Sequence, residues 1–224
     1  MTLLAGALAF ALLTAACGDD APAVTTTETP ATTGGAAFPR EVLGATIPAE
    51  PQRIVSGSAT HTEILFALGA GDRVVAVDLF SDFPAETAGL ERIDAFNLNI
   101  EAVAAFDPDL VILSFDPGDA VSGFESLGIP ALLFPTAPAT LEDAYLEWLA
   151  VGEAVGADDA AVDLVAAARA DVEDLMSRLP ASGDASPTFY HELGEDLYSI
   201  TSSTFIGQLY GMVGLRNVAD ELET

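Results

Sequence analysis

The chain has 224 residues, half of them hydrophobic, and it carries a formal net charge of −28. All seven basic residues are arginine, because the sequence contains no lysine. The hydrophobic content is sufficient for a buried core, and the length allows one large or two small α/β units. A surface this acidic repels phosphate backbones, so we expect no nucleic-acid partner.

An apolar leader opens the chain and ends at its only cysteine, Cys17. The run over residues 3–16 is shorter than the roughly 20 apolar residues of a membrane span, and its length is typical of a secretory signal peptide. The residues around Cys17 resemble a bacterial lipobox. This resemblance implies a signal peptide over 1–17, a lipid on Cys17 and a position on the outer face of the cell membrane or in the periplasm. No arginine precedes the run, so we expect the signal peptide to begin upstream of Met1.

A low-complexity segment follows over residues 18–39. It is rich in Thr, Ala, Pro and Gly and has few side chains that a core would bury. This composition predicts a disordered tether between the lipid and a folded domain.

Short apolar runs then alternate with helical patterns. Buried strands are predicted at 53–56, 74–77, 110–113 and 131–134. Helices are predicted between them at 62–68, 100–106 and 121–127. This alternation predicts βαβ units and a parallel sheet, whose ligands bind beyond the carboxyl ends of the strands.

The second half of the chain is dominated by two longer helical patterns. Residues 141–155 form the first, and residues 158–179 form a second, longer one that ends at a Pro/Gly-containing segment. A strand-like run begins at Thr188. Residues 63–74 and 205–218 are weakly similar to each other, which indicates two related lobes.

No pattern of catalytic residues is present in the sequence. There is no G-x-S-x-G turn, no P-loop, no H-E-x-x-H and no cysteine cluster. We therefore expect a protein that is not an enzyme. The alternative is an enzyme, an extracytoplasmic α/β hydrolase. It requires a nucleophile–base pair that the sequence does not reveal.

The stretch RIVSGSATHTEILFALGAGDRVVAV, residues 53–77, resembles the opening of the class III substrate-binding proteins of ABC importers. Further matching segments lie at 81–84, 99–103, 106–111, 126–130, 204–206 and 214–219. The resemblance implies an α/β fold of two Rossmann-like lobes joined by a long α-helix. We expect an N-terminal lobe over 40–155, the inter-lobe helix over 156–180 and a partial, truncated C-terminal lobe over 181–224.

The same resemblance implies a function. Such receptors capture a metal-bearing organic ligand, a ferric siderophore or cobalamin, and deliver it to an ABC permease and its ATPase. A receptor for haem or for a bare metal ion is the alternative within the same fold. The resemblance also implies a monomer without a cofactor or resident metal, and it implies that Glu101 docks onto the permease. A simpler explanation of Glu101 is that an acidic residue in a first helical turn interacts favourably with the helix dipole.

Ligand-binding residues are predicted at the strand ends, where aromatic side chains suit a large flat ligand. In the N-terminal lobe the candidates are Ala59, Thr60, His61, Phe80, Phe96 and Phe115. In the C-terminal lobe they are Tyr190, His191, Glu192 and Ser202. The phenylalanines also fit an ordinary core. The two histidines fit either contacts to a metal centre in the ligand or capping and surface positions.

Overall fold

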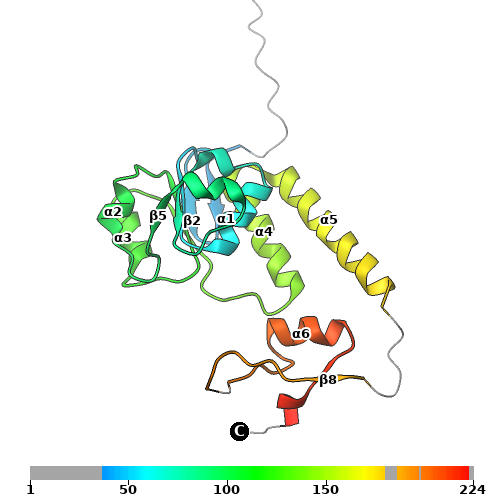
Figure 1. Cartoon of the computed structure of the whole chain (residues 1–224). Coiled ribbons are helices and arrows are strands. Elements are labelled where there is room, and N and C mark those ends of the chain that lie inside the picture. The colour runs from blue at the N-terminus through cyan, green and yellow to red at the C-terminus, as the bar shows by residue number, and fades with distance from the viewer. Residues whose placement is uncertain (1–36, 180–185, 197, 222–224) are drawn as a thin grey trace, which may run out of the picture. The chain divides into compact units, whose positions relative to one another are not determined.

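A computed structural model describes residues 37–179, 186–196 and 198–221 (Figure 1). The predicted leader, Cys17 and nearly all of the predicted tether lie outside these residues. Within the described residues, no helix combines the length and the apolar character needed to cross a membrane.

A five-stranded sheet in the order β5-β4-β3-β6-β7 forms the centre of residues 37–179. Its strands are β3 (Ile54–Ser56), β4 (Val74–Asp78), β5 (Glu91–Ile93), β6 (Leu110–Leu113) and β7 (Ala131–Leu133). Every neighbouring pair is parallel, which confirms the predicted sheet type. β6 is buried along its whole length, as expected for a continuous apolar strand covered on both faces.

Helices cover both faces of this sheet (Figure 1). On one face lie α1 (Ala59–Ala67) and α4 (Leu141–Val155), and on the other lie α2 (Ile100–Ala104) and α3 (Ala120–Ser126). Successive residues of a strand point to opposite faces, so Ile54 joins the core under α1 and α4, whereas Val55 joins the core with Phe124 of α3.

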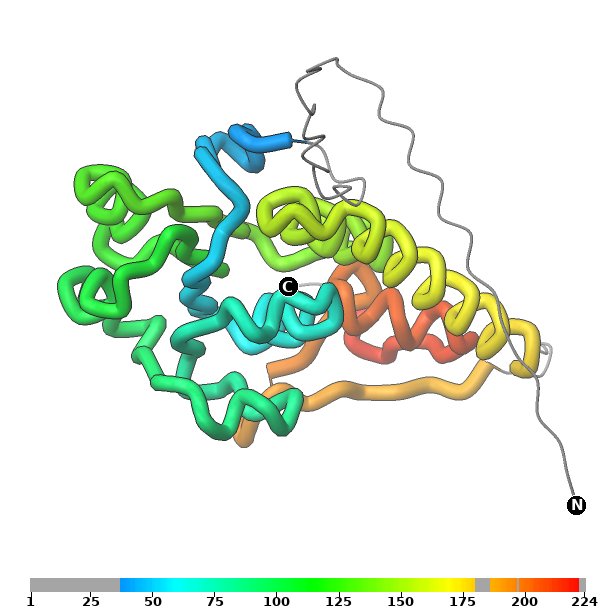
Figure 2. The backbone as a smooth tube through the Cα atoms, turned by 90° about the horizontal axis from the view of Figure 1, so that it is seen from above, coloured from blue at the N-terminus to red at the C-terminus, as the bar shows by residue number. Residues whose placement is uncertain are grey.

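α5 (Asp158–Ser177) follows α4 after a sharp turn at Gly156, whose φ of +74° is in the left-handed region that glycine tolerates best. Figure 2 shows α4 and α5 side by side from a second direction. Their close approach depends on Gly152, because a Cβ atom there would clash with the Cβ of Ala161. α5 occupies most of the range predicted for the inter-lobe helix.

The sequence prediction missed an antiparallel hairpin of β1 (Arg40–Val42) and β2 (Ala45–Ile47). Each strand has only three residues, which is too short for a clear alternation of polar and apolar residues. Phe38 packs against the core beside the hairpin. The buried Arg40 guanidinium lies 2.8 Å from the Asp158 carboxylate at the start of α5.

The C-terminal region, residues 186–221, contains one β-α-β unit. β8 (Thr188–Phe189) pairs in parallel with β9 (Arg216–Asn217), and α6 (Phe205–Met212) lies between them in the chain. Thr204 caps α6, because its hydroxyl accepts a hydrogen bond from the Gly207 amide. The strand predicted at Thr188 is therefore confirmed as a short one.

Candidate functional site

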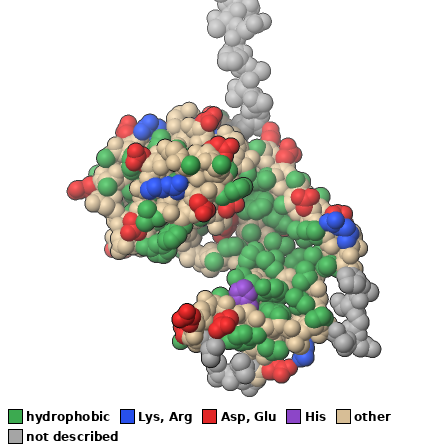
Figure 3. Space-filling view, in the orientation of Figure 1, with side chains coloured by type: hydrophobic (Ala, Val, Ile, Leu, Met, Phe, Trp, Pro, Cys, Tyr) green, Lys and Arg blue, Asp and Glu red, His purple; other side chains and the backbone are tan. Residues whose placement is uncertain are grey.

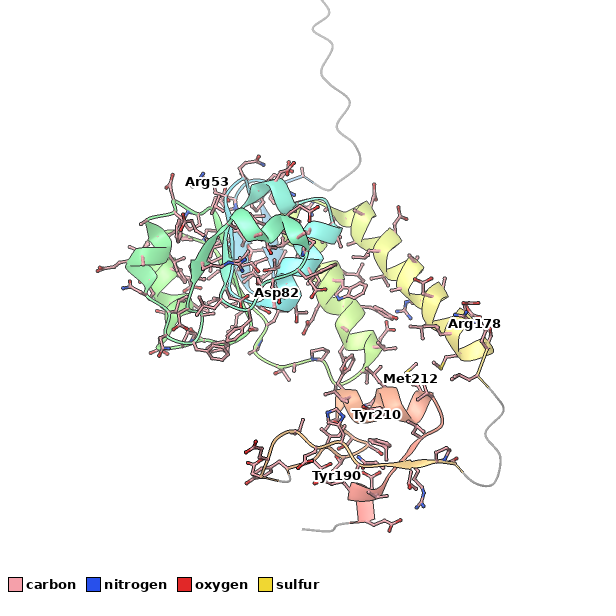
Figure 4. All side chains as sticks on the ribbon, in the orientation of Figure 1. Arg53, Asp82, Arg178, Tyr190, Tyr210 and Met212 are labelled. Carbon is pink, nitrogen blue, oxygen red and sulfur yellow. The ribbon has the colours of Figure 1, made fainter. Side chains whose placement is uncertain are left out.

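The candidate site lies at the carboxyl edge of the five-stranded sheet, where the loops after β3 to β7 meet. Open parallel sheets bind their ligands at this edge. Figure 4 shows Asp82, which follows β4, away from Arg53, which precedes β3 at the opposite edge. The loops present two different surfaces, one aromatic and one polar.

The aromatic cluster consists of Phe80, Phe96 and Phe115, which follow β4, β5 and β6. The ring centroids of Phe80 and Phe96 are 6.0 Å apart in an edge-to-face arrangement, and those of Phe96 and Phe115 are 5.1 Å apart. Phe80 and Phe96 are each 64% exposed. The structure thus brings together three residues predicted separately, and the exposure of two of them excludes the alternative of ordinary core residues.

Two aspartates hold the backbone of this cluster in place. The Asp78 carboxylate accepts a hydrogen bond of 2.7 Å from the Phe80 amide. The Asp94 carboxylate accepts one of 3.0 Å from the Phe96 amide and others from Asn97. The hydrogen bonds from the Asn97 side chain and backbone lower the pKa of Asp94, because they stabilise its charged form.

A buried network of hydroxyl groups supports the loop after β4. The Thr62 hydroxyl lies 2.9 Å from the hydroxyls of both Ser56 and Ser81, and the Ser81 hydroxyl donates to Asp78. Arg92 donates to the backbone carbonyls of Asp78, Ser81 and Thr87. Sequence reasoning missed these residues, because a buried Ser or Thr differs from an exposed one only in its position within the fold.

The polar pocket is a cavity of about 330 Å³ over the ends of β3, β6 and β7. Its polar lining residues are Ser58, Thr60, His61, Ser114, Thr136 and Glu147. Glu147 comes from α4 and was not predicted. A more apolar cavity of about 400 Å³ shares Phe134, Pro138 and Glu147 with it. The predicted residue Thr60 therefore lines the site, whereas Ala59 is half-buried at the start of α1 and outside the pocket lining.

His61 lies behind the polar pocket rather than on its open surface. The residue is 2% exposed, and its ring stacks on Phe134 with centroids 4.4 Å apart. Neither ring nitrogen has a hydrogen-bond partner among the residues that the structure describes. Burial lowers the pKa of His61 from 6.5 to about 4, because the charged imidazolium loses hydration. His61 is therefore a neutral imidazole near neutral pH, and its nitrogens are enclosed.

The carboxylate of Glu147 lies near this imidazole. Its Oε2 atom is 4.0 Å from Nε2 of His61, which is too long for a hydrogen bond. Burial raises the pKa of Glu147, and the nearby Asp143 carboxylate adds to this effect. Both influences disfavour the ionised form of Glu147.

No arginine lines the polar pocket, and each of the seven is engaged elsewhere. Examples are Arg40, which pairs with Asp158, and Arg73, which bonds to Glu50 and to backbone carbonyls. Acidic side chains predominate over basic ones on the face drawn in Figure 3. In the described residues, no group of three or more His, Cys, Asp or Glu side chains is arranged to hold a metal ion.

The four C-terminal candidates are placed differently. The Nδ1 atom of His191 lies 3.1 Å from the Tyr210 hydroxyl, and Phe189 packs against the same tyrosine ring. Figure 4 labels Tyr190 beside this group. The backbone of Glu192 pairs with Ser199 in an isolated bridge.

Ser202, the fourth candidate, is bound within the C-terminal region itself. Its hydroxyl and its amide both donate to the Asp220 carboxylate, and these hydrogen bonds lower the pKa of Asp220. This gives Ser202 a local structural contact. A role in ligand binding for any of the four stays a prediction.

Glu101 lies in the first turn of α2 and is exposed. The helix begins at an Asn99 cap, whose side-chain oxygen accepts a hydrogen bond from the Ala102 amide. The position is compatible both with docking and with a favourable interaction with the helix dipole.

Several known proteins are similar to this chain in sequence. The chain is 30% identical over 181 residues to the ABC transporter substrate-binding lipoprotein YvrC of Bacillus subtilis, covering 78% of this chain and 57% of that protein. It is also 30% identical over 185 residues to a cobalamin-binding protein of Halobacterium salinarum, covering 80% and 49%. The chain therefore spans about half the length of these curated relatives.

Solved structures are similar as well. The periplasmic haem-binding protein RhuT from Roseiflexus sp. RS-1 superposes with a TM-score of 0.66 at 27% identity, over 77% of this chain and 68% of that one. This confirms the predicted fold class, a Rossmann-like α/β lobe with a long helix leading to a second lobe. The family described as periplasmic binding protein matches residues 54–224. The chain belongs to the periplasmic binding protein family.

Proposed function

We propose that this protein is an extracytoplasmic receptor that captures a metal-bearing organic ligand, a ferric siderophore or cobalamin, for an ABC importer. The observation that carries the proposal is the exposed aromatic cluster beside a polar pocket at the ligand-binding edge of the sheet. Exposed rings bury apolar area when a flat ligand stacks on them, while the adjacent polar groups orient its periphery. The names of the two curated relatives, a substrate-binding lipoprotein and a cobalamin-binding protein, favour a receptor over a hydrolase.

A titration of the chain with cyanocobalamin, haemin and ferrioxamine B tests this proposal. Trp148 is the only tryptophan and follows Glu147 on α4, so a coloured ligand bound at the site should quench its fluorescence. We expect saturable quenching with one of the three ligands. Absence of binding to all three, together with turnover of a generic ester, would show that the protein is a hydrolase instead.

A haem receptor is the second candidate, supported by the likeness to RhuT. Haemin binding with a shifted Soret absorbance would favour it. The enclosed ring nitrogens of His61 argue against direct coordination of haem iron by that residue.

Anchoring and docking complete the proposed mechanism. A lipid on Cys17 would hold a monomeric receptor near its permease, which raises the local concentration of the ligand-loaded form. Glu101 would contact the permease, and α5 would join the two lobes that close on the ligand. Glu101→Ala should leave ligand affinity unchanged and lower uptake in cells. A loss of affinity in that variant would contradict the docking role.

A further inference from the structure

The polar pocket contains a carboxylate without a cationic partner. The side chain of Glu147 is 16% exposed, and among the described residues only His61 lies within ion-pair distance of it. A partly buried charge is unfavourable unless another group pairs with it or donates hydrogen bonds to it. Glu147 receives no such hydrogen bond from the described residues. The carboxylate is thus free to accept hydrogen bonds from a bound molecule.

His61 adds a second observation about the Glu147 carboxylate. It is almost completely buried, neither of its ring nitrogens has a hydrogen-bond partner within the described part of the chain, and one of them faces Glu147. Buried polar atoms normally have hydrogen-bond partners, so an imidazole that has none among the described residues shows that His61 does not satisfy the Glu147 carboxylate. A neutral imidazole also leaves the charge of Glu147 uncompensated.

We propose that the polar pocket selects ligands through their N–H groups, carboxamides or amines, and rejects carboxylates. This inference rests on the proposed receptor function and narrows its substrate class. It favours corrinoids, whose periphery carries carboxamides, over haem and over siderophores that present free carboxylates.

The selection follows from charge and hydrogen-bond chemistry. A primary carboxamide donates two N–H hydrogen bonds, and the Glu147 carboxylate is an acceptor only. A ligand carboxylate in the same place would meet a like charge in a partly water-excluded cavity, where repulsion is stronger than in bulk water. No arginine lines the pocket to offset that repulsion. Discrimination of this kind depends on the unfavourable interaction with the wrong group as much as on the favourable one.

Two corrinoids that share the cobalt-containing ring and differ in these peripheral groups provide the test. Dicyanocobinamide carries peripheral carboxamides and dicyanocobyrinic acid carries carboxylates on the same cobalt-containing ring. For the native chain near neutral pH we expect the amide form to bind at least about tenfold more tightly, a difference of about 1.4 kcal/mol. Glu147→Gln should reduce this preference to about threefold or less, because it removes the negative charge and keeps the size of the side chain.

Glu153→Gln is the matched control, since Glu153 lies on α4, is exposed and does not line the pocket. It removes the same charge from the acidic chain and should retain the native preference. Should Glu147→Gln fail to give the native circular dichroism spectrum, Glu147→Ala serves as the second variant with the same expected loss of preference.

Different results separate this inference from the receptor proposal. An unchanged preference in the Glu147 variants, or equal binding of both corrinoids to the native chain, overturns the inference. Haemin binding as tight as that of dicyanocobinamide also overturns it, although the receptor function then stands. If neither corrinoid, haemin nor ferrioxamine B binds, the receptor function fails and this inference fails with it.

Discussion

The aromatic cluster and the polar pocket lie on the same edge of the sheet, yet they expose their key side chains to very different extents. Phe80 and Phe96 are each 64% exposed, whereas His61 is 2% exposed behind Glu147. The apolar rings are held outside the core, and the polar imidazole is held inside it. Both arrangements reverse the usual distribution of side chains between surface and interior.

Such reversals are unfavourable for an isolated domain, and under the proposed function a bound ligand would offset the exposure of the rings. Stacking would remove the exposed rings from water, and N–H groups of the ligand would donate hydrogen bonds to the Glu147 carboxylate. The aromatic cluster and the polar pocket would therefore contribute differently to ligand recognition. In the proposed function the aromatic cluster would supply contact area for any flat ligand, and the polar pocket would discriminate between the groups at the edge of that ligand.

The largest expected effect concerns the buried histidine. In the folded state the pKa of His61 is lowered from 6.5 to about 4, so the unfolded chain binds a proton at a higher pH than the folded one. Stability is therefore lost as the pH falls through this window, by about 3 kcal/mol in total. The free energy of unfolding can be measured with urea at about pH 7.5 and at about pH 4. Its decrease between these two pH values should be smaller in His61→Leu than in the native chain by about this amount.

His191→Gln is the control for that experiment. It removes the other histidine and leaves His61 in place, so the part of the acid-induced loss of stability that comes from His61 should remain. The same acid-induced loss in His61→Leu as in the native chain would show that His61 is not the group responsible.

The second largest effect is expected when the aromatic cluster is removed. The double variant Phe80→Ala/Phe96→Ala should weaken ligand binding by about 100-fold, since each ring contributes on the order of 1–2 kcal/mol of burial and stacking. Fluorescence titration of Trp148 measures it. Phe83→Ala is the matched control, because Phe83 is an exposed phenylalanine outside the cluster. An equal loss in both variants would argue against a specific role for the cluster.

A change at the α4–α5 contact should affect the polar pocket and spare the cluster. Gly152→Ala introduces a methyl group against Ala161 and should destabilise the fold by about 1–3 kcal/mol. Because α4 carries Glu147, the preference for amide over carboxylate corrinoids should also decrease. Adding Ala161→Gly should restore part of the stability measured by urea unfolding, and failure to do so would place the strain elsewhere.

The smallest effect is expected at the turn that positions Phe96. Asp94→Ala removes the acceptor for the Phe96 and Asn97 amides and should weaken ligand binding by about threefold, a typical value for one solvent-exposed hydrogen-bonded turn. Asp94→Asn keeps a side-chain acceptor and should bind like the native chain. Isothermal titration calorimetry measures the ligand affinity of both variants. An equal loss of affinity in both would show that the negative charge of Asp94 matters more than its hydrogen bonds.

Much of the fold was predictable from local patterns. The strand at 110–113 and the helix at 141–155 were correctly predicted, because a continuous apolar run and a clear helical repeat are strong signals. The hairpin β1–β2 and the strand β5 were missed. Each has three residues and gains its stability from pairing with neighbours that are distant in sequence or that follow a turn.

The candidate site was predictable in part. The rule that ligands bind at strand ends selected Phe80, Phe96 and Phe115, and the structure places these three rings together because the topology brings such ends to one edge. Their role in ligand binding stays a prediction. Glu147 was missed, since it lies in the middle of a helix among many acidic residues and only packing places it beside His61. Likewise, no sequence pattern distinguished the enclosed imidazole of His61 from an accessible one.

The aspartates that hold the loops of the aromatic cluster have a consequence for the kinetics of capture. Backbone segments fixed before the ligand arrives lose little conformational entropy on binding, so more of the contact energy is available as affinity. Rings that are already in position also require no slow rearrangement before the encounter complex forms. Ligand association should therefore be fast, and differences among ligands should appear mainly in their dissociation rates.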